Sequence, residues 1–145
     1  MMARGFCEFR DAPGEYRGVN WTKKDMRIEA AKPHGEKTPI KTLIVDDQTL
    51  VREGLRALFD RESDFMLVGE AANGRAAVNA VKKHEPDVVV MDLNMPELNG
   101  IDATRLIKAQ SPQVKVLVLG SSTDRHQVTQ TLQAGAAGYL QKDCT

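Results

Sequence analysis

Short apolar runs that end on acidic residues recur along this chain. The run VVVMDLNMPELNG, residues 88–100, begins with β-branched residues, reaches Asp92 and then breaks at Pro96 and Gly100. Consecutive apolar residues over such a short span are typical of a strand buried on both faces. Strands of this kind belong to α/β sheets, whose ligand sites lie at the carboxyl ends of the strands. Asp92 therefore stands where a reactive or metal-binding carboxylate is expected, although this stretch alone fits an aspartate that caps a loop equally well.

The apolar pattern predicts alternating strands and helices after residue 39. Further strand-like runs lie at 42–45, 65–71, 114–119 and 138–140. The segments between them carry helical signals, and the first has an apolar stripe at i, i+4, i+7 and i+8, which consists of Val51, Leu55, Leu58 and Phe59. The order βαβαβαβαβ predicts an α/β, flavodoxin-like fold: a doubly wound, five-stranded parallel sheet with the strand order 2-1-3-4-5.

Composition and charge narrow the possible functions. The 145 residues suffice for one domain with its own core, and residues 1–39, in which glycines, prolines and mixed charges follow no periodic pattern, are expected to be a flexible N-terminal extension. Twenty basic and twenty acidic residues cancel, so nothing in the net charge indicates nucleic-acid or membrane binding. No apolar run reaches the roughly 20 residues that cross a bilayer, and no signal peptide is evident, which predicts a cytoplasmic protein.

Carboxylates follow the first and third predicted strands. Asp46 and Asp47 come directly after the run at 42–45, as Asp92 comes after its own run. In the order 2-1-3-4-5 these two strands are neighbours, so the three side chains converge at one edge of the sheet. Their mutual repulsion requires a compensating cation, and oxygen ligands with room for water and a phosphate favour Mg²⁺ over Ca²⁺ or zinc. The sequence therefore predicts a magnesium site.

Three motifs resemble those of the receiver domains of two-component response regulators. They are LIVDD at 43–47, VVVMDLNMPELNG at 88–100 and GYLQKD at 138–143, and the resemblance runs from residue 40 to 145. The segments DDQTLVREGL and GAAGYLQKD are most similar to receivers that precede a LuxR-type helix-turn-helix output domain. The resemblance implies a phosphoacceptor domain of a phosphorelay that switches an output domain or a partner in transcriptional regulation, and not an enzyme.

The resemblance also implies a role for individual residues. Asp92 would accept a phosphoryl group from a histidine kinase, and Lys142 would contact the phosphoryl oxygens. Magnesium would be held by Asp46, Asp47, Asp92 and the main-chain carbonyl of Asn94. The expected partners are the kinase and either an output domain or a second receiver, without a membrane and without direct nucleic-acid binding by this chain, because no helix-turn-helix follows the receiver.

The chain departs from the receiver pattern at two places. Receivers carry a serine or threonine at the end of the fourth strand, and that position falls on Gly120, which has no hydroxyl. Either Ser121 substitutes for it or transmission to Tyr139 is weakened, and we favour weakened transmission. Receivers also continue into a fifth helix, whereas this chain stops at Thr145. We therefore expect a receiver that lacks its final helix, best explained by a fragment of a longer regulator, with cover by the N-terminal extension or by a partner as the alternatives.

Two other functions fit part of the pattern. The first is a receiver-like interaction module with weakened phospho-switching, which the glycine at 120 favours. The second is a magnesium-dependent phosphatase that forms an aspartyl phosphate. Enzymes of the haloacid dehalogenase type need a second aspartate two residues after the nucleophile, and the residue here is Asn94. The sequence therefore favours a signalling domain.

Overall fold

A computed structural model describes residues 5–12, 15–21, 37–121 and 124–142. From residue 40 onward the described elements alternate between strand and helix. They are β3 (Ile40–Val45), α1 (Thr49–Phe59), β4 (Phe65–Ala71), α2 (Gly74–His84), β5 (Val88–Asp92), α3 (Gly100–Gln110), β6 (Lys115–Gly120), α4 (Arg125–Gln133) and β7 (Gly138–Gln141).

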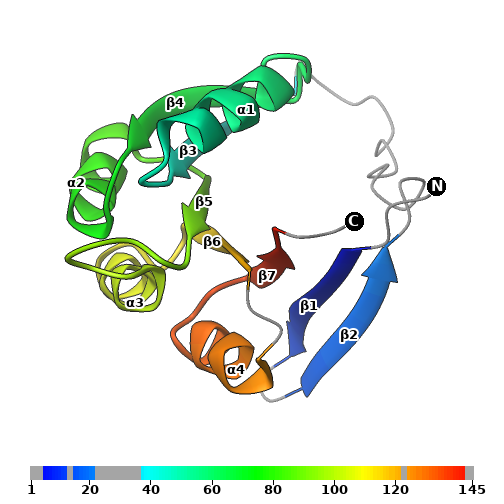
Figure 1. The fold of residues 1–145 in the computed structure, drawn as a ribbon. Helices are drawn as coiled ribbons and strands as arrows, with labels where there is room; N and C mark the ends of the chain where they lie inside the picture. The colour runs from blue at the N-terminus through cyan, green and yellow to red at the C-terminus, as the bar shows by residue number, and fades with distance from the viewer. Residues whose placement is uncertain (1–4, 13–14, 22–36, 122–123, 143–145) are drawn as a thin grey trace.

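The parallel strands have the predicted arrangement. Their order in the sheet is β7-β6-β5-β3-β4, which is the order 2-1-3-4-5 counted along the chain (Figure 1). The pairs Val45↔Met91 and Asp92↔Leu119 place the end of β5 between the ends of β3 and β6. The flavodoxin-like fold class and the four predicted helices are therefore confirmed, and the carboxyl ends of these strands share one edge of the sheet.

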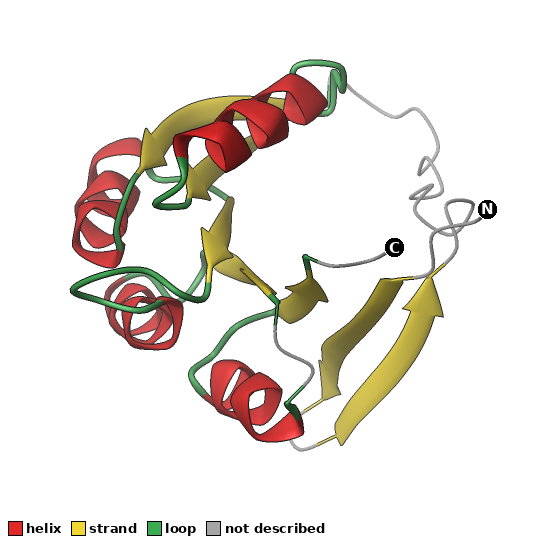
Figure 2. Cartoon of the chain, viewed as in Figure 1, coloured by secondary structure: helices red, strands yellow, loops and turns green. Residues whose placement is uncertain are grey.

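The hydrophobic core lies between one face of the sheet and α2, α3 and α4. Figure 2 shows these three helices along one side of the strands, with α1 apart from them. Alternate residues of β3, β5 and β6 point into this core, as the burial pattern of β6 illustrates: Val116 and Val118 are buried, whereas Leu117 between them is less so. The helices contribute apolar side chains that include Ala77, Val81, Ala103, Ile107, Val128 and Leu132. This core fixes the strand ends that carry the acidic residues.

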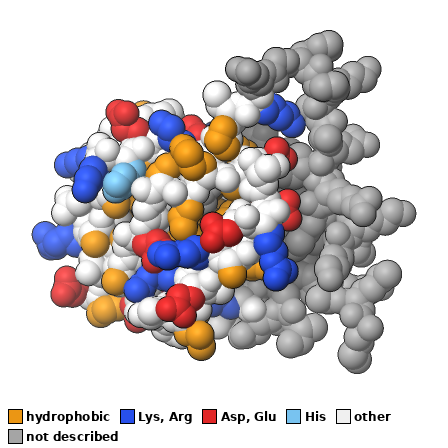
Figure 3. Space-filling view, turned by 90° about the horizontal axis from the view of Figure 1, so that it is seen from above, with side chains coloured by type: hydrophobic (Ala, Val, Ile, Leu, Met, Phe, Trp, Pro, Cys, Tyr) orange, Lys and Arg blue, Asp and Glu red, His pale blue; other side chains and the backbone are white. Residues whose placement is uncertain are grey.

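Helix α1 covers the other face incompletely. It spans the predicted residues, yet none of its side chains is buried: Leu50 is 80% and Leu58 62% exposed. Figure 3, which views the molecule from above, shows basic and acidic side chains interspersed on this surface, with apolar side chains between them. The stripe predicted from Val51 to Phe59 thus packs only partly against the sheet. Within the described residues, no helix is both long enough and apolar enough to cross a membrane.

An N-terminal hairpin adds two antiparallel strands to the sheet. Strand β1 (Gly5–Ala12) pairs with β2 (Glu15–Trp21), and it also pairs with β7 through Cys7↔Leu140 and Phe9↔Gly138. The sequence predicts no strand before residue 40, because mixed charges and glycines hide any strand pattern there. Pairing to β7 depends on main-chain groups of an edge strand rather than on an apolar stripe. That the extension is flexible stays a prediction, and residues 22–36 lie outside the described part of the chain.

Candidate functional site

Three carboxylates meet where β3 and β5 end. Asp46 and Asp47 follow β3 directly, and Asp92 is the last residue of β5. One carboxylate oxygen from each of the three lies within 4.8 Å of the others. Asp46 is fully buried and Asp92 is only 4% exposed, whereas Asp47 is exposed. The convergence that the strand order predicts is therefore present, with two of the three groups withdrawn from water.

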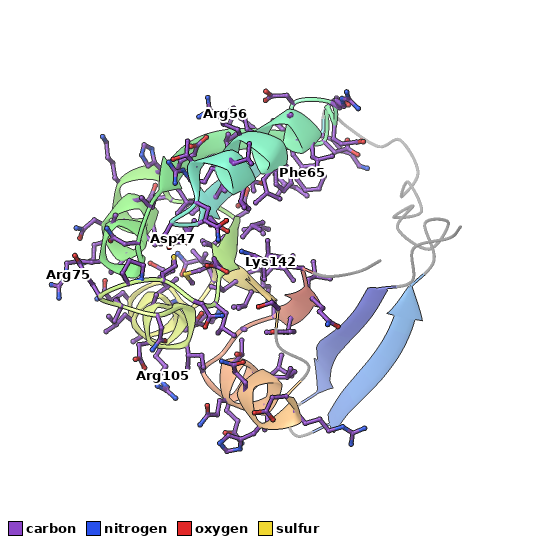
Figure 4. All side chains as sticks on the ribbon, in the orientation of Figure 1. Asp47, Arg56, Phe65, Arg75, Arg105 and Lys142 are labelled. Carbon is purple, nitrogen blue, oxygen red and sulfur yellow. The ribbon has the colours of Figure 1, made fainter. Side chains whose placement is uncertain are left out.

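Lys142 brings an ammonium group to these carboxylates. Its main-chain N–H donates to the carbonyl of Gly120 at 2.8 Å, which continues the pairing of β6 and β7 by one residue. From there its Nζ reaches Asp92 Oδ1 at 2.8 Å and Asp46 Oδ2 at 2.9 Å. Figure 4 shows Lys142 and Asp47 beside the ends of the central strands. The lysine thus bridges the carboxylates of two adjacent strands.

The charges in this cluster oppose one another. Burial raises the pKa of Asp92, the hydrogen bond and charge of Lys142 lower it, and the neighbouring Asp46 and Asp47 raise it again, so that the pKa of Asp92 lies above its ordinary value. Burial lowers the pKa of Lys142, but its bonds to Asp92 and Asp46 outweigh burial and raise it overall. One ammonium facing three carboxylates leaves an excess of negative charge, which favours a cation.

The donor set fits a magnesium ion. Mg²⁺ binds oxygen ligands at about 2.0–2.1 Å, so two of its ligands stand at most about 4.2 Å apart. The oxygens of Asp46, Asp47 and Asp92 lie within 4.8 Å of one another, which is at most about 0.6 Å beyond that separation. Asp47 is exposed, which leaves room for water ligands. This acidic cluster is typical of the magnesium site of receiver domains.

The loop after Asp92 folds back onto its own strand. The N–H of Leu93 donates to the carbonyl of Leu119, and the N–H of Gly100 donates to the carbonyl of Leu93, both at 2.8 Å. A Cβ on Gly100 would lie 2.5 Å from the carbonyl oxygen of Asp92, so only glycine permits this approach. Asn99 then caps α3 by accepting from the N–H of Asp102. The motif MPELNG therefore fixes the main chain beside Asp92, and the side chain of Asn94 within it is exposed.

Tyr139 fills the space next to Gly120. A Cβ on Gly120 would stand 2.1 Å from the hydroxyl oxygen of Tyr139 and 2.7 Å from its Cζ. The tyrosine is 3% exposed, so its ring lies against β6 in the absence of a side chain at 120. Ser121 is exposed, and residues 122–123 lie outside the described part of the chain. Any residue other than glycine at 120 would require Tyr139 to move.

Sequence reasoning missed two polar residues beside the acidic cluster. Arg52, on the first turns of α1, donates from Nη1 to the main-chain carbonyl of Asp46 at 2.8 Å. Its Nε lies 3.4 Å from Oε2 of Glu70 on β4. The apolar stripe alone predicts this helix, and it gives no role to the polar positions of α1. The signal available in the sequence for this contact was the position of Arg52, six residues after Asp46 and near the start of the helix.

The part of the chain that carries the site is similar to known proteins. Residues 42–145 match the family described as response regulator receiver domain. The transcriptional regulatory protein DegU of Brevibacillus brevis is 44% identical over 104 residues, a match that covers 72% of this chain and 44% of DegU. The chain therefore spans about half the length of the curated relatives it matches.

Solved structures show the same fold. A two-component response regulator of the LuxR family from an Aurantimonas species is 34% identical, with a TM-score of 0.70, and the match covers 73% of this chain and 76% of that one. The complex of CheX, CheY, BeF3 and magnesium from Borrelia burgdorferi is 28% identical, with a TM-score of 0.69 and coverage of 74% and 81%.

Proposed function

The chain belongs to the response regulator receiver domain family, and from that premise we propose that it is a phosphoacceptor, phosphorylated on Asp92 by a histidine kinase. Receivers of this family are signalling modules of two-component transcription regulators and not enzymes. The observation that carries the proposal is the buried Asp92 carboxylate, held by Lys142 and flanked by Asp46 and Asp47. A nucleophilic carboxylate, two metal-binding carboxylates and one lysine form a sufficient set for phosphoryl transfer.

Each residue has a chemical role in this proposal. An oxygen of Asp92 attacks the phosphorus in line with the bond to the donor nitrogen, that bond breaks, and an aspartyl phosphate results. Lys142, which now bridges Asp92 and Asp46, donates to an oxygen of the new phosphoryl group. Asp46, Asp47, Asp92 and the main-chain carbonyl of Asn94 would hold Mg²⁺, which when bound neutralises charge on the equatorial oxygens. The Borrelia burgdorferi CheY complex, which contains BeF3 and magnesium, supports this assignment by similarity.

The output of the domain is proposed to be weakened at Gly120. The absent hydroxyl leaves no group at this position to follow the phosphoryl oxygens, and Ser121, the possible substitute, is exposed. Tyr139 already lies against Gly120 without any phosphoryl group. This arrangement also favours the second candidate, a receiver-like interaction module with weakened phospho-switching. The two candidates share Asp92 and differ in whether its modification moves Tyr139.

The expected partners follow from the family. A two-component receiver implies a cognate histidine kinase. Because relatives such as DegU are transcriptional regulatory proteins of which the matched segment makes up less than half, we propose an output domain or a second receiver as the element that reads the modification. The cytoplasmic location expected from the sequence belongs to the same proposal.

Phosphorylation with a small-molecule donor tests the proposed function. The full chain is incubated with acetyl phosphate and Mg²⁺, and intact mass is measured for wild type and for Asp92→Ala. We expect a phosphoryl adduct on the wild type, its loss on Asp92→Ala, and its persistence on Asp102→Ala, which removes an aspartate of α3 outside the acidic cluster. An unmodified wild type, or an adduct that persists on Asp92→Ala, would contradict the assignment.

A further inference from the structure

Arg52 and Glu70 form a polar pair behind the acidic cluster that the proposed phosphoryl transfer leaves unused. Their side chains are only 17% and 22% exposed. Glu70 accepts on one oxygen from Arg56 of the next turn of α1 and lies beside the Arg52 Nε with the other. Two arginines therefore share one carboxylate, and only Arg52 continues from it to the metal-binding loop.

The loop between β3 and α1 depends on main-chain and guanidinium contacts. Asp46 donates its N–H to the carbonyl of Ala71 at 3.1 Å and accepts from the N–H of Gln48 on Oδ1 at 2.8 Å. Gln48, the residue before α1, makes no side-chain capping bond. The Asp46 carbonyl accepts from Arg52 Nη1 at 2.8 Å, which ties the loop to the helix. This bond therefore links the loop that carries Asp46 and Asp47 to the side chain of Arg52.

The shape of the guanidinium suits this task. Arg52 presents Nη1 to the Asp46 carbonyl, Nη2 to the Thr49 hydroxyl at 3.3 Å, and Nε to Glu70. One planar guanidinium group thus contacts three partners in different directions. A lysine ammonium on a flexible stem would not contact all three. The positive charge also stands next to a loop with two aspartates, where it offsets their repulsion.

We propose that Arg52, oriented by Glu70, is a positioning residue that sets the magnesium affinity of the site by holding the Asp46–Asp47 loop toward Asp92. The inference rests on the proposed function for the identity of the metal, and it concerns the loop rather than the phosphoryl transfer. Outer partners of metal ligands typically change metal affinity 10- to 100-fold when removed. Arg56 is the matched control, because it binds the same Glu70 and does not contact Asp46.

Calorimetric titration of the full chain with MgCl2 tests this role. We expect Arg52→Ala to raise the Kd for Mg²⁺ by about tenfold. Arg52→Lys should restore the affinity only in part, because it keeps the charge but loses the planar guanidinium group. Arg56→Ala should leave the Kd within about twofold of the wild type, since the link from Arg52 to Asp46 remains. Amide hydrogen exchange of the metal-free protein gives a second readout. The N–H of Gln48, which donates to Asp46, should exchange faster in Arg52→Ala and not in Arg56→Ala.

The outcomes separate this inference from the proposed function. Equal Kd values for wild type and Arg52→Ala, equal losses for Arg52→Ala and Arg56→Ala, or no Mg²⁺ binding by the wild type would overturn it. If Arg52→Ala does not fold, Glu70→Gln replaces it, because it weakens the hold on Arg52 and leaves that side chain present; an unchanged Kd there also overturns the inference. Mg²⁺ affinities in the expected order without any phosphoryl adduct would refute the proposed function alone.

Discussion

Replacing Gly120 with serine should expel Tyr139 from its place against β6. A new Cβ would stand 2.1 Å from the tyrosine hydroxyl oxygen and 2.7 Å from Cζ, distances that no side chain tolerates. Among the described glycines only Gly135 has a positive φ, so the backbone at 120 accepts a side chain without strain. The cost of Gly120→Ser must therefore come from the contact with Tyr139.

The size of the effect follows from the buried area of a tyrosine. An aromatic side chain buries about 150–250 Å², so exposing half of it uncovers about 100 Å². At about 25 cal/mol per Å² this costs about 2.5 kcal/mol, similar to the 1–3 kcal/mol typical of overpacked cores. The loss of unfolded-state freedom on replacing glycine returns about 0.4–1 kcal/mol. We expect Gly120→Ser to lower the free energy of unfolding by about 2 kcal/mol.

Urea unfolding measures this loss, and a double-mutant cycle assigns it. In a Tyr139→Ala background, where the obstructing ring is gone, the same substitution should cost less than about 0.5 kcal/mol. Fluorotyrosine NMR reports on the position of the Tyr139 ring. The chain has two tyrosines, and the resonance that is absent from Tyr139→Phe belongs to Tyr139. With fluoroberyllate, an acyl-phosphate mimic, the Tyr139 resonance should shift more in Gly120→Ser or Gly120→Thr than in the wild type.

Two results would refute this reasoning. One is an equal penalty for Gly120→Ser with and without the Tyr139 ring, because the cost would then not arise from their contact. The other is an identical response to fluoroberyllate in the wild type and in both substituted forms, because the glycine would then not weaken transmission.

Two further predictions concern stability. Asp92→Asn should raise the free energy of unfolding in metal-free buffer at neutral pH. Burial and the neighbouring Asp46 and Asp47 raise the pKa of Asp92 in the folded protein. Above about pH 3.9, the ordinary pKa of an aspartate in the unfolded chain, the folded state therefore binds more protons than the unfolded state. The wild type loses stability as the pH rises above about 4, and the variant does not. In urea unfolding, the difference in free energy of unfolding between variant and wild type should therefore vanish below about pH 4. A difference that does not change with pH contradicts this prediction. Glu85→Gly should stabilise the protein by about 1 kcal/mol in the same assay, since Glu85 ends α2 with φ 46°, a conformation that favours glycine. Glu85→Gln separates the effect of charge, and Glu62→Gly, at a position without positive φ, should bring no gain.

The strand order and the acidic cluster were predictable because their signals are local. Short apolar runs end on Asp46, Asp47 and Asp92, and the order of elements leaves few topologies that place those ends apart. Lys142 required the resemblance to a family, because a lysine after a four-residue strand carries no signal of its own. These residues could thus be located before any contact between them was known.

Other features depend on contacts that no periodic pattern encodes. The sequence shows the glycine at 120, but it does not show that Tyr139 fills the space where a side chain at 120 would lie. The link from Arg52 to Asp46 joins a side chain to a carbonyl group, which every residue has. The hairpin of β1 and β2 was missed for the same reason, since main-chain groups of β7 make the pairing.

The pairing of β1 with β7 changes which strand of the sheet is free to recruit another chain. In the five-stranded parallel arrangement β7 would be an outer strand, with unpaired amide and carbonyl groups open to a neighbouring molecule. With β1 in place, that side of β7 already has its partner at Cys7↔Leu140, Glu8↔Tyr139 and Phe9↔Gly138. The segment that carries Tyr139 and leads to Lys142 is thereby shielded from intermolecular strand addition, and β2 becomes the outermost strand in its stead.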